Sequence, residues 1–285
     1  MKIFVNRVKS LLLLGALTTA GTVGLTSNPV LAGTLHNGWT YGIDSYNDAT
    51  SRASVGGATN VGGGPFEIFG IALNVGDNDI SVALNSNLGV DGATVPYGSG
   101  YGHTGWGDLF LTNTDTGKSY GMRFTTNNAS GVPELGLYED ISVTTVGVAN
   151  DGWDSYSLYA NFVRSQGGNP SMGDLAINDP LLGDTTNNIM TAGRKIGDIT
   201  QADLTGLDFG HFNANGSQTF GFSFDRSLLE PGNYVAHILE ECANDGVAVM
   251  NKVHEDVPEP SALLGLGSIG LLLASFRRRQ VNTVS

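Results

Sequence analysis

Cysteine is almost absent from this chain: Cys242 is the one cysteine in 285 residues. A single cysteine excludes an intrachain disulfide, so a folded domain must be held together by core burial, helped where needed by bound ions. A cysteine nucleophile would need a histidine close by, and the five histidines are scattered without a local signature. We therefore interpret Cys242 as a buried thiol.

Recognisable catalytic motifs are also missing. The sequence contains no Gly-x-Ser-x-Gly elbow, no His-Glu-x-x-His, no Walker loop and no dinucleotide-binding glycine pattern ahead of a helix. Either Glu240 or Glu241 could be one member of the carboxylate pair of a glycosidase. Adjacent residues of a strand point to opposite faces, however, so the two cannot form the pair together, and the sequence names no other partner. We expect these two to be solvated or edge-strand carboxylates, and we expect the protein not to be an enzyme.

Basic residues are scarce, with 14 against 27 acidic residues. Six of the 14 lie near the two ends of the chain, whereas all acidic residues lie between positions 33 and 260, which gives that segment a formal charge of −19. Such a charge disfavours nucleic acid and anionic membrane surfaces as partners. It favours solubility or the binding of cations.

Long apolar runs occur only near the ends of the chain. Near the start, three basic residues precede the apolar stretch 11–25, and Val-Leu-Ala at 30–32 supplies the small side chains that a signal peptidase inspects. Residues 1–32 are therefore predicted to be a secretory signal peptide, with signal peptidase as the first processing partner. The exported chain would begin at Gly33.

The second apolar run, 261–276, has 16 residues without a charge. A helix that crosses the roughly 30 Å hydrocarbon core needs about 20 residues, so this run predicts a short span that holds the chain only transiently in the inner membrane. Arg277, Arg278 and Arg279 would mark its cytoplasmic end, because flanking basic residues resist translocation. Residues 281–285 would be a cytoplasmic tail.

Before the run stand Pro258, Glu259 and Pro260, and the two prolines keep the backbone extended, as the cleft of a processing enzyme requires. A proline-flanked acid, a short apolar helix and an arginine cluster over 257–280 resemble the PEP-CTERM sorting signal that is read by an exosortase. The alternative is an ordinary membrane anchor.

Several segments of the exported part, among them 43–48, 66–72, 105–110 and 218–229, are likewise similar to exosortase-dependent surface protein families. The resemblance implies export, exosortase processing and a place on the cell surface or in the extracellular matrix. It implies no catalytic residues.

Residues 33–256 are rich in turn-forming residues, and their short apolar stretches alternate with period two. In Phe220-Gly-Phe-Ser-Phe224 every second residue is aromatic, which predicts a strand with one face in a core. We predict an all-β fold, a single β-sandwich or jelly-roll-like domain with one or two short helices.

Two stretches depart from the period of two. The apolar positions of 151–163 recur every three or four residues, which predicts an amphipathic helix with Asp151 able to cap it. A second helical turn is predicted over 200–204, with Thr200 as its N-cap.

Acidic and amide side chains gather in three turn-rich segments: 44–48, 105–108 and 240–246. Calcium takes six to eight oxygen ligands from such flexible loops, so we consider calcium as a cofactor. The alternative is that these side chains simply close turns. The candidate ligands are Asp44, Asp48, Asp108, Asn244 and Asp245.

These features favour a structural or adhesive protein without catalytic activity, which contacts exopolysaccharide through many weak interactions bridged by cations. The alternative is an extracellular carbohydrate-binding or carbohydrate-active protein on the same fold. That alternative requires two facing carboxylates in a cleft lined by Trp39, Trp106 or Trp153.

Overall fold

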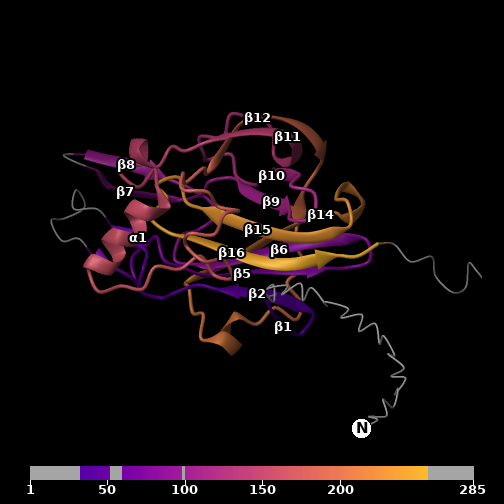
Figure 1. The fold of residues 1–285 in the computed structure, drawn as a ribbon, viewed down its shortest axis with the longest axis horizontal. Coiled ribbons are helices and arrows are strands. Elements are labelled where there is room, and N and C mark those ends of the chain that lie inside the picture. Colours follow the sequence, from indigo (N-terminus) through magenta and orange to yellow (C-terminus); the bar gives the residue numbers. More distant parts are fainter. Residues whose placement is uncertain (1–32, 52–59, 98–99, 256–285) are drawn as a thin grey trace, which may run out of the picture. The chain divides into compact units, whose positions relative to one another are not determined.

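The stretches that alternate with period two form antiparallel strands in a computed structural model, which describes residues 33–51, 60–97 and 100–255 (Figure 1). The described residues all belong to one compact unit. The predicted signal peptide 1–32 and the predicted sorting segment and tail, 257–285, lie outside the described residues.

The first sheet carries its N-terminal strands at one edge and later strands at the other. Its strand order is β1 (Thr34–His36), β2 (Trp39–Ile43), β5 (Ile68–Val75), β6 (Asp79–Ser86), β14 (Gln218–Asp225) and β13 (Thr200–Gln201). Strands β1 and β2 are joined by a tight turn in which Asn37 and Gly38 both have positive φ, as an Asn-Gly hairpin turn requires.

The second sheet lies over the first and is also antiparallel throughout. Its strand order is β12 (Ile189–Gly197), β11 (Gly136–Thr144), β10 (Ser119–Arg123), β9 (Leu109–Asn113), β15 (Gly232–Leu239) and β16 (Gly246–Val253). The prediction of a β-sandwich is therefore confirmed.

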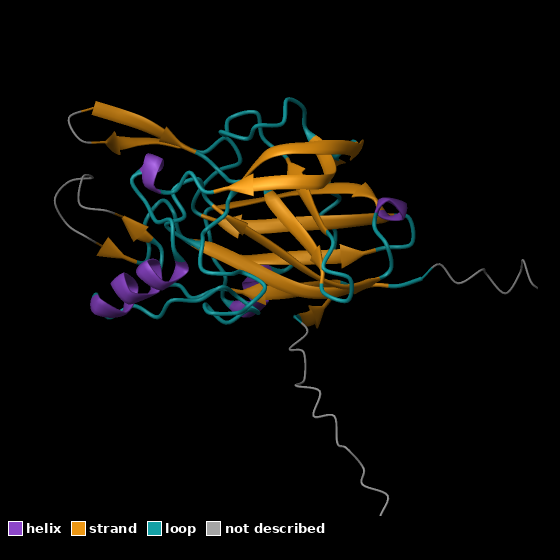
Figure 2. Ribbon diagram, turned by 45° about the horizontal axis from the view of Figure 1, so that its top comes forward, coloured by secondary structure: helices purple, strands orange, loops and turns teal. Residues whose placement is uncertain are grey.

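Short elements complete the fold. Two hairpins pair β3 (Thr50–Ser51) with β4 (Asn60–Val61) and β7 (Ala93–Tyr97) with β8 (Gly100–Thr104). The helices are η1 (Val148–Asn150), α1 (Tyr156–Ser165), η2 (Phe209–Phe212) and η3 (Arg226–Leu228). Helix α1 and the β7–β8 hairpin lie at the same end of the two sheets (Figures 1 and 2).

Apolar side chains from the facing sides of both sheets fill the space between them. Of the predicted aromatic row, Phe224 is buried, while Phe220 and Phe222 pack against the same core. The ring of Phe222 lies 4.9 Å from that of Phe124, between centroids. The inward face predicted for this strand is thus confirmed.

The two segments predicted to be helical, 151–163 and 200–204, differ in detail from the prediction. Helix α1 begins at Tyr156 and its N-cap is Ser155, whose hydroxyl accepts from the Leu158 N–H. The prediction of Asp151 as the cap is wrong, since Asp151 instead ends η1 in the left-handed region at φ 58°. The capped turn predicted at Thr200 is also wrong, because Thr200 pairs with Ser223 as part of β13.

One contact between the sheets depends on the absence of a side chain. A Cβ at Gly42, in β2, would lie 2.2 Å from the carbonyl oxygen of Ala248 in β16. Real Cβ atoms do not approach an oxygen so closely, and here the obstacle is backbone. Glycine at position 42 therefore sets how closely β2 and β16 approach each other.

We expect Gly42→Ala to lower the free energy of unfolding by about 1–3 kcal/mol or more, because the two strands must separate to admit the methyl group. Denaturant unfolding of the variant and the parent chain measures the difference. Gly64→Ala is the matched control, since a Cβ there would meet no atom of the described residues within 4 Å. Equal stability of the two variants would contradict the close approach.

Candidate metal centre

Five acidic side chains meet at one end of the sandwich, where strands of both sheets begin or end. Asp44 and Asp48 follow β2, Glu67 precedes β5, Glu240 follows β15, and Asp245 precedes β16. None of the five exposes more than 5% of its surface. Carboxylates are rarely so deeply buried unless a partner compensates their charge.

Asp44, Asp48 and Asp245 form the centre of this acidic cluster. Each can offer a carboxylate oxygen such that the three oxygens lie within 4.8 Å of one another. Backbone N–H groups of the loop 171–173 donate to Asp44 at 3.2 Å and to Asp48 at 2.7 Å, and the Ile68 N–H donates to Asp245 at 2.8 Å. The backbone therefore holds at least one oxygen of each carboxylate.

Several other oxygens of the acidic cluster lack a partner. Within the part of the chain that the structure describes, four buried carboxylate oxygens have no hydrogen-bond partner: Asp44 Oδ2, Asp48 Oδ1, Glu67 Oε1 and Glu240 Oε1. Among the described residues, no ion pair joins any of the five acids to lysine, arginine or histidine. An unpartnered buried oxygen is costly, and a cation bound by several such oxygens would remove that cost.

The spacing suits a calcium ion. Calcium binds its oxygen ligands at 2.3–2.6 Å, so two oxygens on one ion are separated by at most about 5 Å. The separation of no more than 4.8 Å within the trio meets this limit without movement of the backbone. The trio would supply the first ligands.

Burial changes the protonation of the cluster. It raises the pKa of Asp44 to about 7 and that of Glu67 to about 7. Burial, together with the nearby charges of Asp44 and Glu67, raises the pKa of Asp48 to about 9. The pKa values of Glu240 and Asp245 are also raised, first by burial and then by neighbouring acids. Without a cation, the cluster therefore retains protons at neutral pH.

Helix α1 contributes to the cluster through Tyr159, whose hydroxyl donates to Asp245 Oδ1 at 3.5 Å. Burial, followed by the charges of Asp245 and the other acids, raises the pKa of Tyr159. The phenol therefore stays protonated and remains a donor. The same Asp245 oxygen accepts from the Gly246 N–H at 2.8 Å, so this carboxylate is firmly oriented.

Asn244, another predicted ligand, is adjacent to the trio in sequence but its side chain is otherwise engaged. Its Oδ1 accepts from the hydroxyl of Thr50 at 2.9 Å. The Thr50 oxygen in turn accepts from the indole N–H of Trp153 at 2.8 Å. The side chain of Asn244 thus ties the β15–β16 turn to β3.

Asp108, the last predicted ligand, is not part of the trio. Its carboxylate accepts from the Met190 N–H and the Ser130 hydroxyl, both at 2.7 Å, and from the Asn128 amide at 3.1 Å. With both oxygens engaged, Asp108 serves to join β9, β12 and the loop after β10.

The sequence did not point to Glu67 as a member of the cluster. It stands in the apolar run 66–73, and a single acid within an apolar run is the one signal that could have found it. The expectation that Glu240 and Glu241 are solvated or on an edge is wrong, since both are buried. Glu241 is satisfied by the N–H groups of Gly105 and Ala129, whereas Glu240 joins the cluster.

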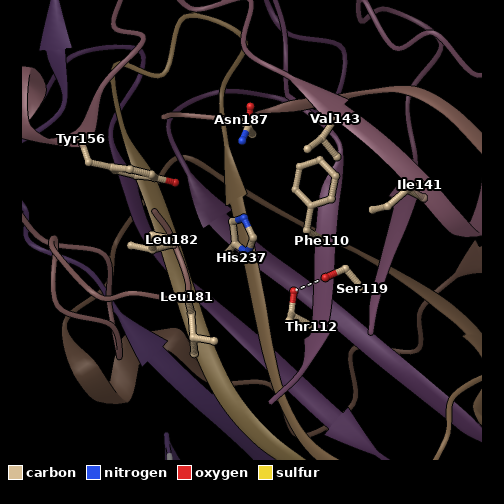
Figure 3. Close-up of a pocket in the computed structure, with 10 residues that line it drawn as sticks. All are labelled: Phe110, Thr112, Ser119, Ile141, Val143, Tyr156, Leu181, Leu182, Asn187 and His237. Atoms are coloured by element: carbon tan, nitrogen blue, oxygen red, sulfur yellow. Dashed lines mark hydrogen bonds between the residues drawn. The ribbon is translucent and has the colours of Figure 1, made fainter. Parts of the chain in front are cut away.

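A pocket of about 250 Å³ lies on the outer face of the second sheet (Figure 3). Its walls include Phe110 of β9 and His237 of β15. The residues on either side of each of them face the core, so these two side chains point outwards. None of the described residues that line it is acidic. This pocket therefore lacks the carboxylate pair that glycoside hydrolysis requires.

These observations define the described part of the chain as an all-β sandwich domain with a buried acidic cluster at one end. The PEP-CTERM protein-sorting motif matches residues 256–279. The predicted sorting signal is thus confirmed at these residues, and the motif implies exosortase-dependent export towards the cell surface. No curated protein and no solved structure matches the chain.

The predicted inner-membrane segment, 261–276, lies outside the described residues. Within the described part, no helix is long and apolar enough to cross a membrane.

We expect the chelator-treated protein to lose stability as the pH rises from 7 to 9. Asp48, with a pKa of 3.8 when unperturbed and about 9 when folded, binds more protons in the folded state over this range, so the free energy of unfolding falls as pH rises. His237 acts in the opposite direction, but only between about 4 and 6.5, because burial lowers its pKa.

Melting curves followed by circular dichroism at pH 7, 8 and 9 measure this effect. Asp48→Asn cannot ionise and should show a weaker pH dependence than the parent chain. A melting temperature of the parent chain that rises over this range would contradict the raised pKa.

Proposed function

We propose that this protein is a non-catalytic structural or adhesive component of the cell surface or extracellular matrix, whose folded domain is completed by calcium. The observation that carries the calcium proposal is the set of four buried carboxylate oxygens without a partner at the meeting point of the two sheets. The PEP-CTERM motif supports the location.

Calcium fits the cluster better than other common cations. The trio offers only carboxylate oxygens, whereas zinc prefers nitrogen and sulfur ligands. Magnesium keeps several of its bound water molecules and is seldom enclosed by protein oxygens alone. Calcium, in contrast, accepts six to eight oxygen ligands. A buried group of five acids therefore favours calcium.

Burial of the acids supports a structural rather than a catalytic role. Substrate could not reach carboxylates that expose at most 5% of their surface. The tryptophans that would have lined a sugar cleft are buried too, and the indole N–H groups of Trp39 and Trp106 donate to the backbone carbonyls of Thr205 and Gly89. They act as core residues.

In this proposal, the signal peptide directs export and the sorting motif directs release from the membrane. Signal peptidase removes residues 1–32, the segment 261–276 holds the chain briefly in the inner membrane, and the exosortase cuts near Pro258-Glu259-Pro260. The charge of −19 on the exported part then favours weak contacts to exopolysaccharide bridged by cations.

Calcium titration of the full chain tests the metal centre. At a hundredfold excess over Kd, binding adds about 2.7 kcal/mol to the free energy of unfolding, which for a domain of this size raises Tm by roughly 5–10 °C. Asp48→Asn should lose this response and, without calcium, melt above the parent chain at pH 9, because a buried charge has been removed.

Asp154→Asn is the matched control, since it removes the same charge from an exposed position. We expect it to respond to calcium like the parent chain. The calcium proposal fails if the parent chain melts at the same temperature with and without calcium, or if the two variants respond alike.

The intact mass of the protein recovered from the native cell surface tests the sorting proposal separately. We expect a C-terminus near Pro258, and a product that retains Arg277, Arg278 and Arg279 in cells lacking the exosortase. Retention of the arginines in both strains would show that the tail is a plain anchor.

A further inference from the structure

A second group of metal-ligating side chains lies on the surface of the first sheet. His36 is the last residue of β1, Asp208 is the N-cap of η2, and His211 lies within η2. Each can offer one nitrogen or oxygen such that the three atoms lie within 4.8 Å of one another. The fold thus joins two segments that are far apart in the sequence.

The spacing of two of these atoms matches a tetrahedral metal site. His36 Nε2 and Asp208 Oδ2 are 3.6 Å apart, which exceeds an ordinary hydrogen bond. Two atoms that each lie 2.0–2.1 Å from a tetrahedral zinc ion are separated by roughly 3.3–3.5 Å. A shift of a few tenths of an ångström would bring these two atoms to that spacing.

The two imidazole rings of the group lie face to face. The rings of His36 and His211 stack with centroids 3.9 Å apart and an interplanar angle of 8°. Phe212 meets both rings edge-on, at 85° and 88°. A histidine nitrogen binds a metal in the plane of its ring, so the exposed His211 ring must turn out of this stack before both rings can bind the same ion.

Asp208 is fixed in place by contacts that leave one oxygen available. Its Oδ1 accepts from the His211 N–H at 3.0 Å, and its own N–H donates to the hydroxyl of Tyr41 at 2.7 Å. Oδ2 is the oxygen that faces His36. Such outer contacts orient a ligand before the metal arrives.

We propose that His36, Asp208 and His211 form a surface site for a divalent transition metal, with zinc as its occupant. Two imidazoles and one carboxylate suit zinc, whereas calcium selects oxygen ligands alone. The side chains of His36 and Asp208 are 25% and 49% exposed, so the fourth coordination position faces solvent and is free for water or an external donor. The site is chemically separate from the acidic cluster.

Titration of the full chain with Co²⁺, in the presence of excess Ca²⁺, tests the proposal. Co²⁺ replaces zinc in tetrahedral sites and then absorbs in the visible, so one equivalent should produce this band and Zn²⁺ should abolish it. Removing an outer partner of a metal ligand costs roughly 10- to 100-fold in affinity, and we expect His36→Ala and His211→Ala to lose at least as much.

His254→Ala is the matched control, because His254 is exposed and outside the group. It should bind Co²⁺ like the parent chain. Asp208→Asn keeps an Oδ1 acceptor for the N-cap while weakening the metal ligand, so its affinity should fall although circular dichroism shows an intact fold. The proposal is overturned if the His36 and His211 variants bind like the His254 variant, or if no tetrahedral band develops.

Discussion

The enclosure of five carboxyl groups where the two sheets meet is the constraint on which this domain depends. Four of the acids directly flank a strand, and Asp48 lies in the loop between β2 and β3. Backbone N–H groups from the loop 171–173 and from Ile68 hold three of the five. Protons or a cation must offset their mutual repulsion, because water is excluded. The charge state of the cluster therefore acts on β2, β5, β15 and β16 together.

A domain exported without disulfides needs another way to join distant parts of its chain. The acidic cluster draws on positions from Asp44 to Asp245, which spans most of the described sequence. A bound ion at this point would tie distant loops together, as disulfides do in other secreted domains. The free energy of unfolding that it adds would depend on the ion concentration outside the cell.

Sequence patterns could predict the strands because alternation is a local property. The Phe220–Phe224 row faces the core as expected. The sequence also pointed to Asp44, Asp48 and Asp245, whose carboxylates the fold brings together. The start of α1 was placed at Asp151 rather than Ser155, because both can cap and only tertiary packing decides between them. Glu67 escaped notice because its burial depends on strands far away in the sequence.

Cys242 is buried, as predicted, and burial followed by the charge of Glu240 raises its pKa. Only the thiolate attacks a disulfide or reacts readily with peroxide, so the folded domain keeps this sulfur chemically inert. Outside the cell, where oxidants would otherwise couple exposed thiols, two copies of this protein cannot become covalently linked through Cys242. Any assembly of the folded protein therefore involves no disulfide through Cys242.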